Sequence, residues 1–459
     1  MKKVTLLAIA FFISFLFVTN SQVPNVPIPI TVGPQPTYIN GYYNFSQNDY
    51  RLLVTSLGVD ANFNGVEDPG DQKPALYTIS INEIMSGKFS GTVLRELDFG
   101  SLPFPTRIYV DINGNFAYVP NKLKIDKISL ENGDIIYSLN PFANQTLPED
   151  AFIQSVFVYS GLVFVTVQGT NINNFYIFEE QTSEIFFESA AELYPQQILV
   201  IGNYLLILCE GTFGQNDSKL MIYQISDLAS KLIVYVNTID IGDTGNHLYP
   251  VGTDKVIVTM NGSHQVHIIN LATAEIEKTI QFPTTGFDGP RESAIVSQNY
   301  IVSTAYDGNL YIHNFEGVKT GQTFVGDKLE GLFAYTFPNP NMNFTIVAAT
   351  SPFKPDYTPN DKVYLFVNFS DVKESIEALT AKLYPNPAKD FVQIYLNSDS
   401  SKPVEIQIVD QMGRNVEKYS FNIAGKEILL PINTISDGLY FAKVSSNGRI
   451  QSIPFVVIR

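Results

Sequence analysis

Apolar and polar positions alternate in short runs along most of the chain, a pattern that predicts β-strands. Between about residues 39 and 375, an apolar strand is repeatedly followed by a polar turn and a second strand that is also rich in apolar residues. The earlier strand of each pair lies at residues 51–54, 116–119, 162–165, 204–208, 256–258, 300–302 and 344–348. The later strand lies at residues 76–81, 125–130, 175–178, 220–225, 266–271, 310–315 and 363–369. Helical periodicity is scarce, and the best helix candidates are short segments at 226–230 and 371–377.

The spacing of these copies predicts a repeat fold. Successive copies start about 40 to 50 residues apart, which is the length of a four-stranded propeller blade. A β-sandwich would also give many short strands, but it would not repeat one phrase at blade period over so much of the chain. We therefore expect an all-β protein, with a seven-bladed β-propeller at residues 22–378 and a small Ig-like β-sandwich at residues 379–459. The phrase Phe116-Ala-Tyr-Val-Pro-Asn121 resembles the YVTN-type propellers of secreted bacterial proteins, and that resemblance implies a shape without naming a ligand.

Residues 1–21 are predicted to be a secretory signal peptide. Lys2 and Lys3 precede an apolar run from Leu6 to Val18, and small polar residues follow up to Ser21. A transmembrane anchor is the alternative, but the run is shorter than the ~20 residues that a spanning helix needs. We expect cleavage after Ser21 and no membrane-spanning segment in the mature chain.

The charge of the mature chain argues against nucleic acid as a partner. Removing Lys2 and Lys3 leaves 27 of the 29 basic residues against 45 acidic ones, a net charge of −18. Binding to phosphates needs clustered Lys and Arg, so this balance fits cations or plain solvation instead. Cys209 is the single cysteine, which excludes an intramolecular disulfide, and we expect it to be a small buried apolar residue.

The C-terminal region carries an ordered set of motifs. They are Tyr384-Pro-Asn-Pro387, a strand at 391–396, Asp410-Gln-Met-Gly413, Asp437-Gly-Leu-Tyr440 and a last strand that ends at Arg459. In this order they resemble the type A C-terminal sorting domain of the type IX secretion system of Bacteroidetes. The resemblance implies transport across the outer membrane by that machinery, often with removal of the domain and attachment of the cargo to surface lipopolysaccharide. An unrelated Ig-like module is the alternative.

One segment has the spacing of a calcium loop. Asp60, Asn62, Asn64, Val66, Asp68 and Asp71 occupy loop positions 1, 3, 5, 7, 9 and 12, and Gly65 stands at position 6, where the chain turns sharply. Position 12 is Asp rather than Glu, as in dockerin and thrombospondin-repeat loops, and no helices flank the segment. Because Ca²⁺ prefers six to eight oxygen ligands, Ca²⁺ is the expected ion. A turn rich in Asp, Asn and Gly is the alternative.

A second candidate site is the mouth of the central channel, where propellers bind ligands. By register, Arg107, Gln154, Gln197, His247, Arg291 and Glu330 would ring this mouth. Polar residues beside loops are also common as solvated surface, which is the alternative.

No catalytic motif is present: the sequence has no His-Glu-x-x-His, Gly-x-Ser-x-Gly, P-loop or Rossmann fingerprint. We therefore expect a non-catalytic secreted or surface binding protein, whose partners are the type IX machinery and an extracellular protein, glycan or small molecule. The alternatives are a lactonase-like or glycan-active propeller enzyme, with Glu292 and Glu330 as its carboxylates, or a structural surface-layer or adhesive component.

Overall fold

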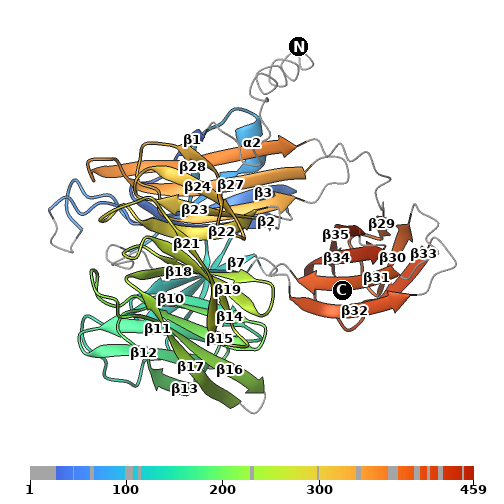
Figure 1. Ribbon diagram of the computed structural model, residues 1–459, viewed down its shortest axis with the longest axis horizontal. Coiled ribbons are helices and arrows are strands. Elements are labelled where there is room, and N and C mark those ends of the chain that lie inside the picture. Colours follow the sequence, from blue (N-terminus) through green and yellow to red (C-terminus); the bar gives the residue numbers. More distant parts are fainter. Residues whose placement is uncertain are drawn as a thin grey trace.

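The computed structural model describes residues 27–44, 46–62, 67–98, 107–111, 115–227, 232–296, 299–337, 343–370, 381–396, 404–410, 414–421, 427–446 and 449–458. These residues are mostly β-strand, so the all-β class is confirmed (Figure 1). The predicted signal peptide at residues 1–21 lies outside the described residues. Within them, no helix is long and apolar enough to cross a membrane.

Strands between residues 28 and 370 of the described chain form seven four-stranded antiparallel sheets. Six sheets are built from consecutive strands: β2 (Pro36–Asn44), β3 (Asp49–Ser56), β4 (Ala75–Ser80) and β5 (Thr92–Glu96); β6 (Tyr109–Asp111), β7 (Phe116–Asn121), β8 (Lys124–Ser129) and β9 (Ile135–Leu139); β10 (Phe152–Tyr159), β11 (Leu162–Gly169), β12 (Ile172–Glu179) and β13 (Ile185–Ala190); β14 (Pro195–Ile201), β15 (Tyr204–Cys209), β16 (Ser218–Asp227) and β17 (Leu232–Gly242); β18 (Gly245–Val251), β19 (Lys255–Met260), β20 (Gln265–Asn270) and β21 (Glu275–Gln281); and β22 (Pro290–Val296), β23 (Tyr300–Ala305), β24 (Asn309–Asn314) and β25 (Lys319–Phe324).

The seventh sheet joins the two ends of this region. It contains β26 (Leu332–Phe337), β27 (Asn343–Phe353) and β28 (Pro359–Ser370), and its outer strand is β1 (Ile28–Thr31), which pairs antiparallel with β28. Ile30 lies opposite Val363 and is fully buried with Val363 and Leu365. Since burying one such side chain stabilises a fold by about 1.5–3 kcal/mol, β1 fastens the first residues to the last sheet.

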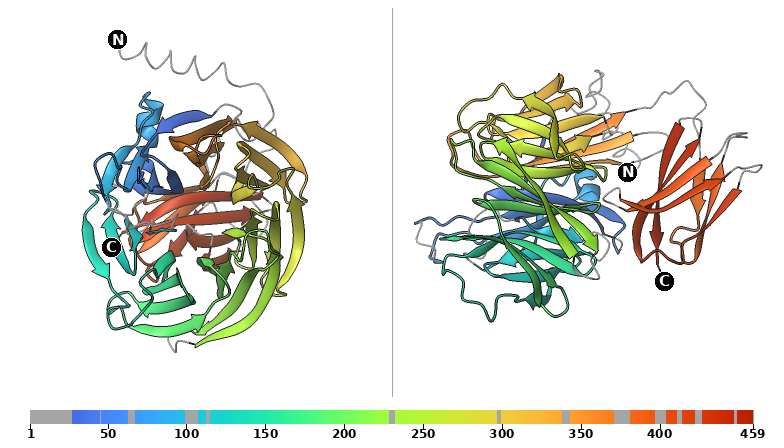
Figure 2. Two further views of the ribbon diagram at one scale, coloured as in Figure 1. Left: turned by 90° about the vertical axis from the view of Figure 1, so that its left-hand side faces the viewer. Right: turned by 60° about the horizontal axis from the view of Figure 1, so that its bottom comes forward.

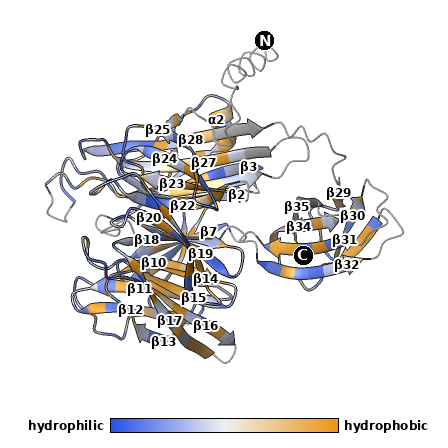
Figure 3. Ribbon diagram, in the orientation of Figure 1, coloured by the Kyte–Doolittle hydropathy of each residue, from blue (hydrophilic) through white to orange (hydrophobic). Residues whose placement is uncertain are grey.

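The sheets follow one another around a ring. First strands of neighbouring sheets pack together, β10 on β14, β14 on β18, β18 on β22 and finally β26 on β2. The left view of Figure 2 shows the sheets around this ring in sequence order, from blue through green to yellow. Each sheet buries apolar side chains against its neighbours, as Leu53 and Leu76 do against Val119 and Ile128. Figure 3 accordingly shows hydrophobic colour along the strands and mostly hydrophilic loops.

The remaining strands form a second unit with its own core. A three-stranded sheet of β29 (Ala381–Tyr384), β30 (Phe391–Leu396) and β33 (Glu427–Pro431) accompanies a four-stranded sheet of β32 (Asn415–Phe421), β31 (Val404–Asp410), β34 (Gly438–Ser446) and β35 (Arg449–Val457). Val392, Ile394, Ile406 and Phe455 are fully buried in the core of this unit. The guanidinium of Arg414 lies 4.6 Å from the ring of Tyr159, the last residue of β10.

The expected helices differ from those observed. Residues 226–230 were a helix candidate, but Ser226 and Asp227 belong to β16, which is long because it pairs with β17 along its whole length. Residues 371–377 lie outside the described residues. Within the described chain the helix is α2 (Ile81–Met85), and the Ser80 hydroxyl accepts a hydrogen bond from the Glu83 N–H at its start.

Candidate functional site

Five first strands carry a β-bulge at the end where they begin. The pairing of each first strand with its neighbour shifts between Pro36 and Tyr38, Ile153 and Ser155, Pro195 and Gln197, Gly245 and His247, and Pro290 and Ser293. The residues left unpaired are Thr37, Gln154, Gln196, Asn246, Arg291 and Glu292. A bulge inserts a residue without a cross-strand partner and re-aims its side chain. All five bulges lie at the same end of the ring, which we call the mouth end.

The side chains at the mouth end line a shallow cavity, which we call the mouth depression. It is open to solvent, and its walls are Thr37, Tyr38, Arg107, Gln196, Asn246, Arg291, Glu292 and Glu330. Four of the five bulges contribute to these walls. The bulges therefore gather polar side chains from sheets that are far apart in the sequence.

A buried ion pair spans the ring axis at this depression. Arg107 Nη1 lies 2.5 Å from Glu292 Oε1, and Nη2 donates to the backbone oxygen of Asn246 at 2.8 Å. The other oxygen of Glu292 accepts the Leu332 N–H at 2.8 Å. Burial alone would raise the pKa of Glu292, but the charge of Arg107 and these other contacts outweigh it and hold that pKa below its ordinary value. Glu292 is therefore an ionised structural partner at neutral pH.

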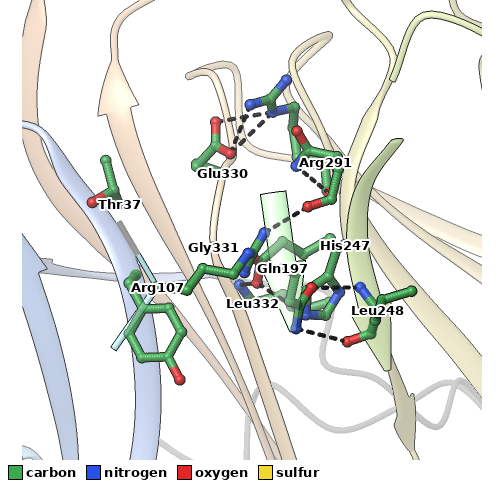
Figure 4. Close-up of polar contacts among 12 residues, drawn as sticks. Thr37, Arg107, Gln197, His247, Leu248, Arg291, Glu330, Gly331 and Leu332 are labelled. Atoms are coloured by element: carbon green, nitrogen blue, oxygen red, sulfur yellow. Dashed lines mark hydrogen bonds and ion pairs between the residues drawn. The ribbon is translucent and has the colours of Figure 1, made fainter. Parts of the chain in front are cut away.

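A second ion pair lies between two neighbouring sheets. Arg291 Nε lies 3.0 Å from both carboxylate oxygens of Glu330, and Nη2 lies 2.9 Å from Oε1 (Figure 4). The hydroxyl of Tyr306 donates to Glu330, and its ring lies 4.6 Å from the Arg291 guanidinium. Both charges of the pair are thus neutralised in place.

Two of the residues expected at the mouth join neighbouring first strands beside the depression. The Gln197 amide accepts from Leu248 N–H at 2.7 Å and donates to the Leu248 backbone oxygen at 3.3 Å (Figure 4). His247 Nδ1 accepts the Ser293 N–H at 3.3 Å, and its Nε2 lies 4.0 Å from Glu292. Burial lowers the pKa of His247 to about 4, against the opposing attraction of Glu292, so the ring is neutral at pH 7.

The structure therefore brings three of the six expected residues, Arg107, Arg291 and Glu330, to the walls of the depression. Gln154 lies beside them and donates to Gln196 at 2.6 Å. At the other two positions, the residue one step earlier, Gln196 or Asn246, lines the depression in place of Gln197 or His247. A signal for this offset was available, because Pro36, Pro195, Gly245 and Pro290 each open a first strand immediately before its bulge.

The predicted calcium loop lies at the same end of the ring, since it joins β3 to β4, and Ser56 at the end of β3 pairs with Pro36. An isolated antiparallel bridge between Val59 and Gln72 closes its base. Asn64 and Val66 fall outside the described residues.

Asp71 holds the described part of the loop together. One of its carboxylate oxygens accepts the Ala61 N–H at 2.8 Å, and the other accepts the Asp68 N–H at 2.7 Å. Asn62 donates to the Asp68 carboxylate at 2.7 Å, and its backbone N–H donates to Asp60 at 3.3 Å. These hydrogen bonds join the start of the loop, at Asp60 to Asn62, to its end, at Asp68 to Asp71. Among the described residues alone, no group of three or more His, Cys, Asp or Glu side chains could hold a metal ion.

Cys209 offers no reactive thiol. It is fully buried in β15, and burial raises its pKa to about 12. Because the thiolate is the nucleophile, such a thiol is inert at neutral pH.

Comparison with known families decides the nature of the second unit. Residues 382–459 match the model of the secretion system C-terminal sorting domain. This sorting domain marks the chain as cargo of the type IX secretion system, either secreted or attached to the outer surface. None of the curated proteins matches the sequence.

Solved structures resemble the sheet ring. The WD40 β-propeller domain of Doa1 is 12% identical with a TM-score of 0.50, over 76% of this chain and 97% of that one. BBS1N, in its complex with ARL6DN, is 12% identical with a TM-score of 0.50, over 77% and 99%. PorZ, a surface component of the type IX system of Porphyromonas gingivalis, is 13% identical with a TM-score of 0.45, over 92% of this chain and 59% of PorZ. At such identities the likeness to the first two structures shows the propeller fold alone.

Proposed function

We propose that this chain is a secreted or surface-attached, non-catalytic binding protein that holds its ligand at the mouth depression. The observation that carries the proposal is the depression itself, a cavity at the ring axis walled by polar side chains from six sheets. Ligands of repeat and propeller folds bind where loops and strand ends from several units converge. Export through the sorting domain then delivers this surface to the outside of the cell.

The same proposal includes the finer architecture. We infer a seven-bladed ring of the YVTN-like kind that β1 closes, an Ig-like sandwich for the sorting domain, and a signal peptide removed after Ser21. The seven four-stranded sheets of the described chain and their end-to-end closure support the blade number.

We further propose that the loop from Asp60 to Asp71 binds Ca²⁺ and stiffens the mouth end. The spacing of its six candidate donors supports this, and so do the hydrogen bonds that join Asn62 to Asp68 and the two ends of the loop to Asp71. Calorimetric titration with Ca²⁺ tests it. We expect heat of binding for the intact protein and none for Asp60→Ala, and absence of heat from the intact protein would contradict it.

Glu210 is the feature that favours the enzyme alternative. Burial raises the pKa of its carboxyl group, and raised carboxyl pKa values are typical of general acids. By contrast, Glu292 and Glu330 are each committed to an arginine. We therefore place binding before catalysis and use Glu210 to separate the two.

A binding screen tests the proposed function. The mature protein would be screened by thermal shift against oligosaccharides, peptides and purified components of bacterial surfaces, with Gln196→Ala and Tyr38→Phe as variants of the depression. We expect a ligand whose binding both variants weaken. Binding that neither variant changes would overturn the placement at the mouth. Turnover that Glu210→Gln abolishes would overturn the non-catalytic assignment.

A further inference from the structure

The charged groups of the mouth depression leave no spare charge for an ionic ligand. Arg107 is paired with Glu292 and Arg291 with Glu330, and the side chains of these four residues are 6–17% exposed. An anion or a cation bound here would have to break one of these pairs, and a buried charge without its partner costs several kcal/mol. The depression is thus polar and electrically balanced.

Some polar groups in these walls still lack a partner. Asn246 is 1% exposed, and its Nδ2 donates to the Arg291 backbone oxygen at 2.8 Å, while its Oδ1 has no hydrogen-bond partner. Within the described residues, Gln196 uses its oxygen to accept from Gln154, and the Tyr38 hydroxyl accepts from Asn40 at 3.2 Å. The Gln196 amide N–H groups and the Tyr38 hydroxyl can therefore each donate a hydrogen bond to a ligand. The walls offer both an acceptor and donors to one ligand.

An exposed aromatic pair belongs to the same end of the ring. Phe213 and Phe287 are 46% and 63% exposed, and their rings stack at 4.6 Å with an angle of 12° between the planes. The loop of Phe213 is fastened by the Gly214 N–H, which lies 3.0 Å from the Asp243 carboxylate, just before β18. Phe287 stands four residues before Arg291. Two large apolar rings are thus exposed to water at the end of the ring that carries the depression.

We propose that the ligand of the mouth depression is a neutral saccharide, an inference that rests on the function proposed above. Each sugar hydroxyl both donates and accepts a hydrogen bond, which suits an acceptor at Asn246 beside donors at Gln196 and Tyr38. The C–H face of a sugar ring is apolar and packs on an aromatic surface such as the Phe213–Phe287 pair. The depression is shallow and open to solvent, so a sugar ring would lie across its mouth rather than be enclosed in it.

The experiment is calorimetric titration of the mature protein with a fixed probe panel. The neutral probes are maltose, lactose, chitobiose and mannobiose; the charged comparators are a digalacturonic acid and a trilysine peptide. We expect a neutral disaccharide to bind and Phe287→Ala to weaken it at least tenfold. Phe324→Ala is the matched control, because Phe324 is also exposed, at 67%, and is not part of the stacked pair. It should leave the affinity within twofold.

The outcomes distinguish a failure of the saccharide inference from a failure of the proposed binding function. A charged comparator that binds in place of the neutral sugars, and that Gln196→Ala weakens, would overturn the saccharide class while keeping the depression as a binding site. Neutral binding that is equally unaffected by Phe287→Ala and Gln196→Ala would overturn both. Since Phe287 is on the surface, loss of folding is not expected, and an unchanged midpoint of urea unfolding would verify that.

Discussion

The loop from Asp60 to Asp71 and the mouth depression lie at the same end of the ring, but they are built in opposite ways. The loop is one segment of twelve residues, and its described residues are joined by hydrogen bonds within that segment. The depression takes its walls from strands spread between Thr37 and Glu330. A local site of this kind can change without disturbing the ring, whereas the walls of the depression also join the sheets. The following experiments test that difference.

Breaking the buried ion pair of the depression should have the largest effect. Arg107→Met leaves Glu292 buried without its cation, and we expect a loss of about 3–5 kcal/mol in the free energy of unfolding, measured with urea. The matched control is Lys255→Met, because the Lys255–Glu277 pair is about one-third exposed and should contribute less than about 1 kcal/mol.

Replacing both partners, with Arg107→Met and Glu292→Leu together, should restore part of the loss, since no unpaired charge remains. Calcium binding at the loop should persist in both variants. A single variant as stable as the Lys255→Met control would show that the pair does not hold the sheets together.

Acid should weaken the depression before it weakens the loop. The pKa of His247 is lowered to about 4 by burial, whereas an unfolded histidine titrates near 6.5. Between these two pKa values the unfolded state binds a proton that the folded state does not bind. The free energy of unfolding is therefore highest above pH 6.5 and falls as the pH drops to about 4. The expected loss is about 3 kcal/mol, and His313, also lowered to about 4, adds to it.

Urea unfolding at a series of pH values measures this dependence. His247→Gln should remove the contribution of His247, so that the free energy of unfolding falls less steeply between pH 6.5 and 4. The control Gln265→Ala replaces a side chain that carries no titrating group and should leave the slope unchanged. An unaltered slope in His247→Gln would contradict the role of the buried imidazole.

The loop should respond to calcium and to little else. At a Ca²⁺ concentration of about one hundred times the dissociation constant, binding stabilises the folded state by about 2.7 kcal/mol. Asp71→Ala should remove this gain and also loosen the loop, because Asp71 accepts two backbone N–H groups. Asp356→Ala is the control, an exposed aspartate in a loop that accepts hydrogen bonds from Thr358. A calcium-dependent shift that survives Asp71→Ala would place the ion elsewhere.

The same contrast explains what the sequence could reveal. The second and third strands of each sheet follow directly from their apolar runs, and the loop follows from its spacing. The closing strand β1 was missed because four residues carry too little periodicity, and its partner Val363 is more than three hundred residues away. Arg107, Arg291 and Glu330 were expected at the mouth and line the depression, but Gln197 and His247 were expected where Gln196 and Asn246 line it. A bulge shifts the strand pairing by one residue, and a prediction based on strict alternation of apolar and polar residues does not include that shift.

The smallest effect tests that one-residue offset. Gln197 lies beside the depression and joins β14 to β18 through both hydrogen bonds of its amide, so Gln197→Ala should cost about 1–2 kcal/mol in urea unfolding and leave ligand binding intact. The control is Gln265→Ala, because the Gln265 amide bonds Gln281 on the exposed face of a sheet and should cost less than about 0.5 kcal/mol. If Gln197→Ala instead weakens binding as Gln196→Ala does, both residues face the ligand. The bulge would then not separate the role of Gln196 in the depression from the role of Gln197 between the strands.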